Sequence, residues 1–177
     1  SAGAVVISKL AAYPDLQVVN LVVDAPTPLQ SGSVMTIHWA DLNSGTRATS
    51  LGWSDSLIVT NLSTGATLAT IAISYDPAAN GNGPIEVNGS RSRQFIYQIP
   101  DGNAGVGDIR FTIVTDATDA FYEFNPSGTG ETNNSASTTL AVRLAPYPDL
   151  ALSNVIAPSL LVGDPASLTI SWHVANI

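Results

Sequence analysis

The chain has no cysteine, a single lysine and no long apolar run, and each absence excludes a class of protein. Without cysteine it forms no disulfide, no thiolate metal site and no cysteine nucleophile. Its 177 residues include 14 Asp and Glu against six Lys and Arg, and the net charge of −8 repels nucleic acids and anionic membranes. Although 45% of the residues are hydrophobic, no apolar run reaches the ~18 residues of a membrane span. We therefore expect a folded protein with no nucleic-acid partner and no membrane insertion.

A segment near the start of the chain recurs near its end, which indicates an internal repeat. The sequence LAAYPDL at 10–16 returns as LAPYPDL at 144–150. Further along, MTIHWADLN at 35–43 matches LTISWHVAN at 168–176. The two copies are therefore offset by about one domain length.

This repeat predicts three parts. Residues 1–11 are expected to be the last strand of a preceding repeat, 12–145 a complete repeat, and 146–177 the first two strands of the next repeat. We expect the chain to be a piece of a tandem repeat array. The link at 144–148 is short and holds two prolines, so successive repeats should form a semi-rigid rod.

Within the complete repeat, apolar residues alternate with polar ones at a period of two, which predicts strands and not helices. About seven short strands separated by Gly, Asn and Pro turns predict an all-β fold, an immunoglobulin-like antiparallel β-sandwich. The expected strands are 16–23, 35–39, 56–61, 67–74, 95–99, 109–113 and 137–143, with 4–10, 148–156 and 166–175 in the flanking parts.

Asp41 interrupts this pattern. It follows Trp39 at a position where the alternation calls for an inward apolar residue, and the second copy has Val174 there. We expect either that the strand ends at this point or that a bulge turns the carboxylate outward.

Several segments together resemble the CARDB family, the cell-adhesion-related domain found in bacteria. They are Pro14-Asp15-Leu16, a glycine at 32 before the strand that ends in Trp39, Trp53-Ser54-Asp55, and the run DATDAFYEFNPSGTGETNN at 116–134. The resemblance implies an immunoglobulin-like sandwich that occurs in tandem on bacterial surface proteins. It also implies an extracellular stalk or adhesive module without catalytic residues or an obligatory cofactor.

The residues themselves offer little for catalysis. His38 and His173 are the two histidines, and neither has a nucleophile and an orienting carboxylate nearby in the sequence. The chain contains no His-Glu-x-x-His motif and no phosphate-binding Gly-rich loop with lysine. We therefore expect that the protein is not an enzyme.

An acidic stretch gives a stronger indication of a functional site than the histidines do. Asp116, Asp119, Glu123 and Glu131 lie close together in the sequence, with asparagine and glycine between them. Ca²⁺ takes ~6–8 oxygen ligands in flexible geometry, so these four carboxylates are candidate calcium ligands, although their spacing fits no EF-hand. The alternative is that Asp and Asn side chains fold the loop by bonding its backbone. For Asn133 and Asn134 we favour this second interpretation.

The aromatic residues leave two interpretations open. Trp39 and Trp172 hold equivalent strand positions and are expected in a core. A second group lies near the predicted loops, where its rings either close the end of the sandwich or stack on sugars. This group is Trp53, Tyr75, Phe121, Tyr122 and Phe124.

Two functions follow from these observations. The first is a non-catalytic structural or adhesive module of an extracellular bacterial surface protein or fibre, stiffened by calcium, with a host or matrix glycan or protein as a further partner. Neighbouring copies would associate head to tail by strand addition, residues 1–11 of one molecule pairing with 146–177 of another, and so form filaments. The alternative is a carbohydrate-binding accessory module of a secreted hydrolase.

Overall fold

The computed structural model describes residues 7–160, 162–165 and 167–177. Segments with alternating apolar residues form the strands of this part of the chain. Contacts divide the chain into unit 1, Ser1–Ala145, and unit 2, Pro146–Ile177. The elements of unit 1 are β1 (Leu16–Asp24), β2 (Val34–Asn43), β3 (Trp53–Asn61), β4 (Ala66–Tyr75), β5 (Ser90–Gln98), a 3₁₀ turn (Gly102–Gly105), β6 (Gly107–Val114) and β7 (Ser135–Val142). Unit 2 contains β8 (Leu150–Ile156) and β9 (Ser171–Asn176).

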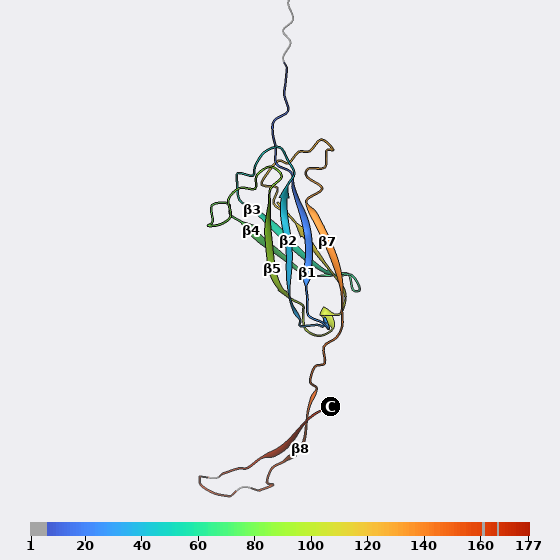
Figure 1. Cartoon of the computed structure of the whole chain (residues 1–177). Helices are drawn as coiled ribbons and strands as arrows, with labels where there is room; N and C mark the ends of the chain where they lie inside the picture. Colours follow the sequence, from blue (N-terminus) through green and yellow to red (C-terminus); the bar gives the residue numbers. More distant parts are fainter. Residues whose placement is uncertain (1–6, 161, 166) are drawn as a thin grey trace, which may run out of the picture. The chain divides into compact units, whose positions relative to one another are not determined.

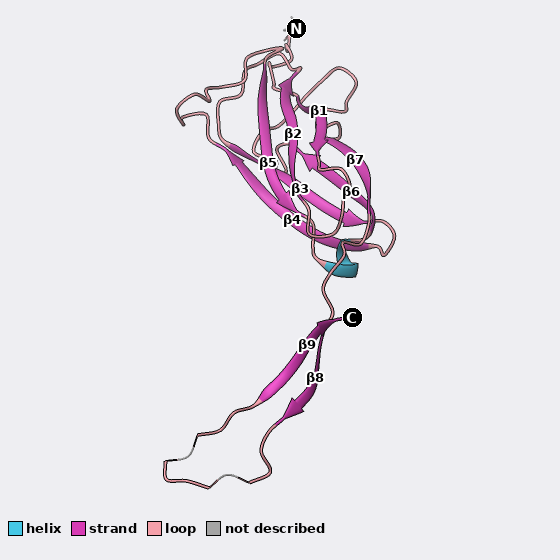
Figure 2. Ribbon diagram, turned by 60° about the horizontal axis from the view of Figure 1, so that its bottom comes forward, coloured by secondary structure: helices cyan, strands magenta, loops and turns pink. Residues whose placement is uncertain are grey.

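Unit 1 consists of two antiparallel sheets (Figures 1 and 2). The first has the strand order β1-β2-β5 and the second the order β4-β3-β6-β7. Each neighbouring pair runs antiparallel. The predicted all-β antiparallel fold is therefore confirmed.

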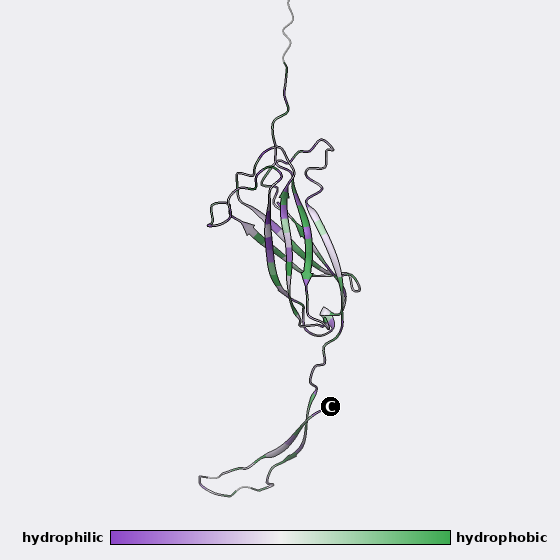
Figure 3. Cartoon of the chain, in the orientation of Figure 1, coloured by the Kyte–Doolittle hydropathy of each residue, from purple (hydrophilic) through white to green (hydrophobic). Residues whose placement is uncertain are grey.

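The core lies between the two sheets, because each sheet turns one face inward. Met35 and Tyr97 come from the first sheet, and Leu57 and Phe111 from the second; all four are buried in one apolar cluster. The rings of Tyr97 and Phe111 meet edge to face with centroids 6.1 Å apart. Figure 3 shows hydrophobic and hydrophilic residues mixed along the strands, as expected where only one face of each sheet is buried.

The strand that carries Asp41 does not behave as expected. β2 continues to Asn43 and stays in regular register with β5, where Asp41 lies opposite Arg91. The Asp41 side chain is fully buried. Both expectations, a strand end and an outward bulge, are wrong, because the sandwich interior contains a cation that pairs with this carboxylate.

Unit 2 is an antiparallel hairpin whose pairing repeats that of β1 and β2. Leu150 lies opposite Asn176 in β8–β9, as Leu16 lies opposite Asn43 in β1–β2. Both pairs lose register at the same point in the strand, around Asn20 in β1 and around Asn154 in β8. These two asparagines share a left-handed backbone, with φ of 55° and 52°.

The strand prediction lacks support in two places, before β1 and before β9. Residues 167–170, expected in a strand, are not in one, because β9 begins at Ser171. The strand expected at 4–10 falls largely on residues 1–6, which lie outside the described residues. The described remainder, 7–10, is not in a strand. Among the described residues, no helix is long and apolar enough to cross a membrane.

Candidate functional site

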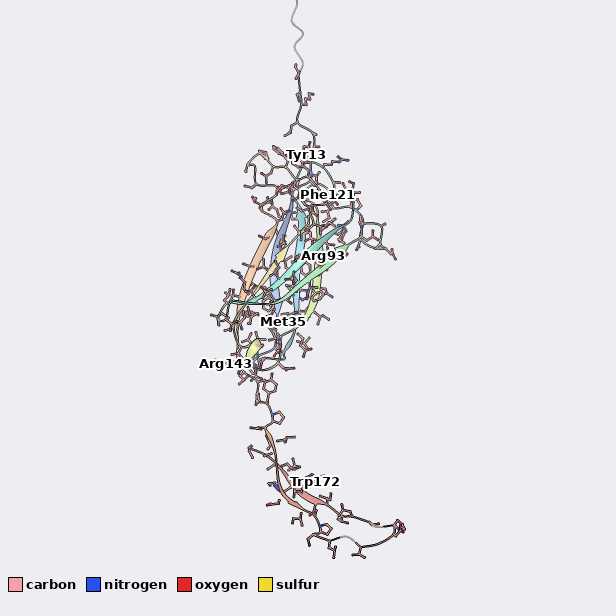
Figure 4. The ribbon with its side chains drawn as sticks, turned by 180° about the vertical axis from the view of Figure 1, so that it is seen from behind. Tyr13, Met35, Arg93, Phe121, Arg143 and Trp172 are labelled. Atoms are coloured by element: carbon pink, nitrogen blue, oxygen red, sulfur yellow. The ribbon has the colours of Figure 1, made fainter. Side chains whose placement is uncertain are left out.

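The acidic stretch lies at the end of unit 1 where the chain enters β1. In Figure 4, Tyr13 and Phe121 mark this end, Arg143 the opposite end, and Arg93 lies between them. Three aromatic rings form a cluster at this site. Trp53 stacks on Tyr75 with ring centroids 4.2 Å apart, and the Phe121 ring packs against Trp53 with centroids 5.9 Å apart. These three rings are buried, so they close the end of the sandwich. Trp53 is therefore not available to stack on a sugar.

Asp116 folds the start of the β6–β7 loop. Its two carboxylate oxygens accept the backbone N–H groups of Ala120 and Phe121, each at 2.9 Å. Asp116 has a left-handed backbone, with φ of 45°, which lets the chain reverse at that point. Burial raises the pKa of Asp116, although the two backbone hydrogen bonds oppose the shift.

Glu123 ties the same loop to the first strand. It is 2% exposed, and its carboxylate accepts the N–H of Leu16 at 2.8 Å and the Asn134 amide at 2.6 Å. Burial raises the pKa of Glu123 to about 7 in spite of these two hydrogen bonds. A single carboxylate thus joins β1, the loop and the start of β7.

Glu131 closes the loop on the surface. Its carboxylate accepts the Glu123 N–H at 2.6 Å. The two segments approach closely because residue 130 is glycine: a Cβ there would lie 2.8 Å from the Glu123 carbonyl carbon. Desolvation raises the pKa of Glu131, and the neighbouring Asp119 carboxyl adds to the shift.

The structure therefore brings the four predicted calcium ligands into one loop, but it uses them differently. Three of them accept loop or strand hydrogen bonds, which matches the alternative interpretation of the acidic stretch. Across the described residues, no group of three or more His, Asp or Glu side chains is arranged to hold a metal ion. Calcium binding stays a prediction.

Asp15 is a second centre of this site. Its carboxylate accepts hydrogen bonds from Ser44 at 2.6 Å, Asn133 at 2.9 Å and Asn125 at 3.2 Å. Burial by itself raises the pKa of Asp15, but these hydrogen bonds outweigh it and the pKa is lowered. Asn133 and Asn134 were expected to bond the backbone; their amides instead donate to the carboxylates of Asp15 and Glu123.

Asn43 holds the entering chain against the end of β2, a role that the sequence analysis missed. Its side-chain oxygen accepts the N–H of Asp15 at 3.1 Å, and its amide donates to two backbone carbonyls. In unit 2 the N–H of Asp149 donates to Asn176 at 2.7 Å in the same way. The signal in the sequence was the match between these two asparagines in the repeat.

A buried ionic cluster lies between the sheets, next to the cluster of aromatic rings. One guanidinium nitrogen of Arg93, on β5, is 3.1 Å from Asp41 on β2 and 3.1 Å from Asp55 on β3. Trp39 donates its indole N–H to both carboxylates at 3.2 Å, and Trp53 donates to Asp55 at 2.9 Å. The cluster thus joins the two sheets through hydrogen bonds as well as charge.

Two carboxylates share one guanidinium in this cluster, so one negative charge has no cation of its own. This excess of negative charge favours protonation of one carboxylate. Burial, and then the charge of Asp55, raise the pKa of Asp41 to about 8 against the pull of Arg93. Burial also raises the pKa of Asp55. One proton held by the pair at neutral pH would leave the cluster without net charge, the cheapest state in a poorly solvated interior.

No family model and no curated protein matches the chain. The solved structures that are similar to it include two of one CARDB domain. The crystal structure of the CARDB domain of the PF1109 protein from Pyrococcus furiosus, in complex with di-metal ions, is 18% identical and has a TM-score of 0.47; the match covers 77% of this chain and 100% of that one. A solution NMR structure of the PF1109 CARDB domain is 16% identical with a TM-score of 0.49, covering 76% and 100%. Both are domains of the family that the sequence resembles.

Replacing the shared cation tests the buried cluster. Arg93→Met should lower the free energy of unfolding by about 3–5 kcal/mol at pH 8, because it leaves buried carboxylates without a partner. The loss should be smaller at pH 5, because burial raises the pKa of both carboxyls and loss of the cation favours their neutral forms further. Urea denaturation at the two pH values measures it, with Arg91→Met on the same strand as the control, since Arg91 bonds only backbone carbonyls. An equal loss at both pH values would contradict the account.

The raised pKa of Glu123 predicts that the free energy of unfolding depends on pH. Its folded-state pKa of about 7 lies above the ordinary 4.5, so the folded state binds the extra proton. This contribution to stability is complete below about pH 4.5 and is lost as the pH rises to about 7. Glu123→Gln should therefore lose less unfolding free energy than the wild type between pH 5 and pH 8. The exposed Glu86→Gln is the control; identical pH profiles for Glu123→Gln and wild type would refute the assignment.

Proposed function

We propose that this chain is a non-catalytic structural and adhesive module of an extracellular bacterial surface protein or fibre. In this proposal it is a CARDB-type repeat with an immunoglobulin-like sandwich, and successive copies form a rod. The observation that carries the proposal is the internal repeat, together with the matched pairing of its two hairpins.

The matched hairpins support repetition because register is a demanding criterion. A shift of one residue would move every side chain to the other face of the strand. β8–β9 nevertheless has the opposing pairs, the irregularity and the left-handed asparagine of β1–β2. Two segments so alike in sequence and pairing are best explained as the same part of two successive domains.

The strand order supports the immunoglobulin-like assignment. Sheets β1-β2-β5 and β4-β3-β6-β7 divide seven strands three to four, as a seven-strand immunoglobulin-like sandwich does. A tryptophan buried between the sheets is a further feature of that class, although Trp39, 2% exposed, lies on the second strand, β2, and not on the third.

The same proposal includes a calcium ion that binds the acidic loop and stiffens it. Asp116, Asp119, Glu123 and Glu131 would supply the oxygen ligands, after some of their present hydrogen bonds were exchanged. The loop lies at the end of unit 1 where a preceding repeat would join, so an ion bound there would act on the joint.

Head-to-tail association is supported by the apolar face of unit 2. Leu150, Leu152, Trp172 and Val174 are all at least half exposed, whereas their counterparts in unit 1 are buried. Residues 1–11 match the end of unit 1 in sequence, where β7 contacts β1. A copy of this segment from a second molecule could therefore lie along β8 as β7 lies along β1.

Small-angle scattering of a protein with three successive repeats tests the rod. A compact globule of about 400 residues would have a radius of gyration of about 21 Å. We expect a clearly larger radius that grows in proportion to the number of repeats, and a further increase in calcium relative to EDTA if the loop binds the ion. A radius that follows the compact value would overturn the stalk function.

Sedimentation velocity of the 177-residue chain tests the head-to-tail contact. We expect larger species as the concentration rises, and a return to the monomer for Leu152→Lys, which puts a charge on the exposed face of β8. Thr139→Lys, on the exposed face of β7 in unit 1, serves as the charge-matched control. A wild-type chain that stays monomeric at high concentration would refute this part of the proposal.

A second candidate function is a carbohydrate-binding accessory module of a secreted hydrolase. One observation favours it: Tyr122 is 65% exposed although its two neighbours, Phe121 and Glu123, are buried. An aromatic ring presented in this way is a usual element of sugar recognition.

A further inference from the structure

Tyr122 stands between two hollows at the loop end of unit 1. The first, of about 210 Å³, is lined by residues that include Tyr13, Arg47 and Ser50, and the second, of about 190 Å³, by Glu131 and others. Tyr122 lines both. Each hollow is smaller than the ~300–1,000 Å³ of a drug-sized pocket, so each has room for a single ring-sized group.

The ring of Tyr122 is held in place without being covered. Tyr13 meets it edge to face, with centroids 5.0 Å apart and planes at 77°. Its neighbours in the chain are anchored by the buried Phe121 ring and the Glu123 carboxylate. Ligand binding to such a ring costs little conformational entropy, because the ring is already fixed.

Arg47 gives the first hollow a cation. Its backbone is fixed, since its N–H donates to the Tyr13 carbonyl and its own carbonyl accepts from Asn43. Among the described residues, none forms a hydrogen bond or ion pair with its guanidinium. A guanidinium that is free, exposed and next to aromatic rings can take a carboxylate in a bidentate contact.

The second hollow has the opposite character. Glu123 and Glu131 line it together with Asn125, and it contains no basic residue among those described. An anion would be repelled there, whereas a neutral group with hydroxyls could donate a hydrogen bond to the Glu131 carboxylate. The two hollows therefore select different groups on the two sides of one ring.

We propose that Tyr122, with the two hollows beside it, is a binding site for an acidic saccharide in which a carboxylate-bearing sugar is joined to a neutral one. The acidic sugar occupies the hollow with Arg47, the neutral sugar the hollow with Glu131, and the Tyr122 ring packs against the chain between them. The net charge of −8 does not forbid this, because at physiological salt charges beyond about 8 Å are screened. The proposal rests on the second candidate function and is independent of the rod.

Hyaluronan oligosaccharides test the site, because they alternate a uronic acid with a neutral N-acetylated sugar. Isothermal titration calorimetry should detect binding by the 177-residue chain that weakens as salt rises. Chito-oligosaccharides of the same length, which lack carboxylates, should bind at least tenfold more weakly. Loss of one charge-assisted contact corresponds to about tenfold in affinity.

Two variants locate the site. Arg47→Gln should weaken hyaluronan binding about tenfold, and Tyr122→Ala about fivefold or more, while both keep the wild-type melting temperature because both side chains are exposed. Arg110→Gln, the same change of charge on the exposed face of β6, should bind as the wild type does.

Four results would overturn the proposal. They are no hyaluronan binding, equal binding of the neutral oligosaccharide, wild-type affinity in either site variant, and tighter binding of poly-glutamate, which would make the ligand an acidic peptide. None of them changes the scattering result, so failure of this site and failure of the stalk function are distinguishable.

Discussion

Arg93 lies between two buried carboxylates, one from each sheet of unit 1, and the arrangement of the sandwich depends on this contact. Asp41 and Asp55 would each be costly in the interior without a cation, and two indole N–H groups complete their hydrogen bonding. Since these partners come from β2, β3 and β5, the cluster fixes the two sheets relative to each other. An apolar core alone tolerates more ways of packing than such a cluster does.

At the end of the sandwich that Tyr13 and Phe121 mark, the acidic residues hold the loop together through hydrogen bonds. Asp15, Asp116 and Glu123 do not simply solvate a loop; they accept hydrogen bonds from the backbone and from asparagine amides. Long loops have many backbone groups without partners, and here the carboxylates provide them. The same loop carries Tyr122, whose ring is exposed and contacts that of Tyr13.

The two units show the same hairpin in two surroundings. In unit 1 the inward face of β1–β2 is covered by the second sheet, and in unit 2 the equivalent face of β8–β9 is exposed. The buried ionic partner is also particular to unit 1, because Val174 replaces Asp41. The two hairpins therefore share the backbone pairing and differ in the residues that line its inward face.

Local pattern in the sequence was enough to predict the strands β1 to β7, the antiparallel all-β fold and the loop that gathers the acidic residues, because alternation and turn chemistry depend on neighbours in the chain. It was not enough to predict that Asp41 points inward, because its partners Arg93 and Asp55 are far from it in sequence. The same holds for the asparagine amides, which bond carboxylates instead of backbone, and for Trp53, which is buried under Phe121 while Tyr122 is exposed. Only the tertiary structure decided these points, since the energy of a polar or aromatic side chain depends on which distant groups surround it.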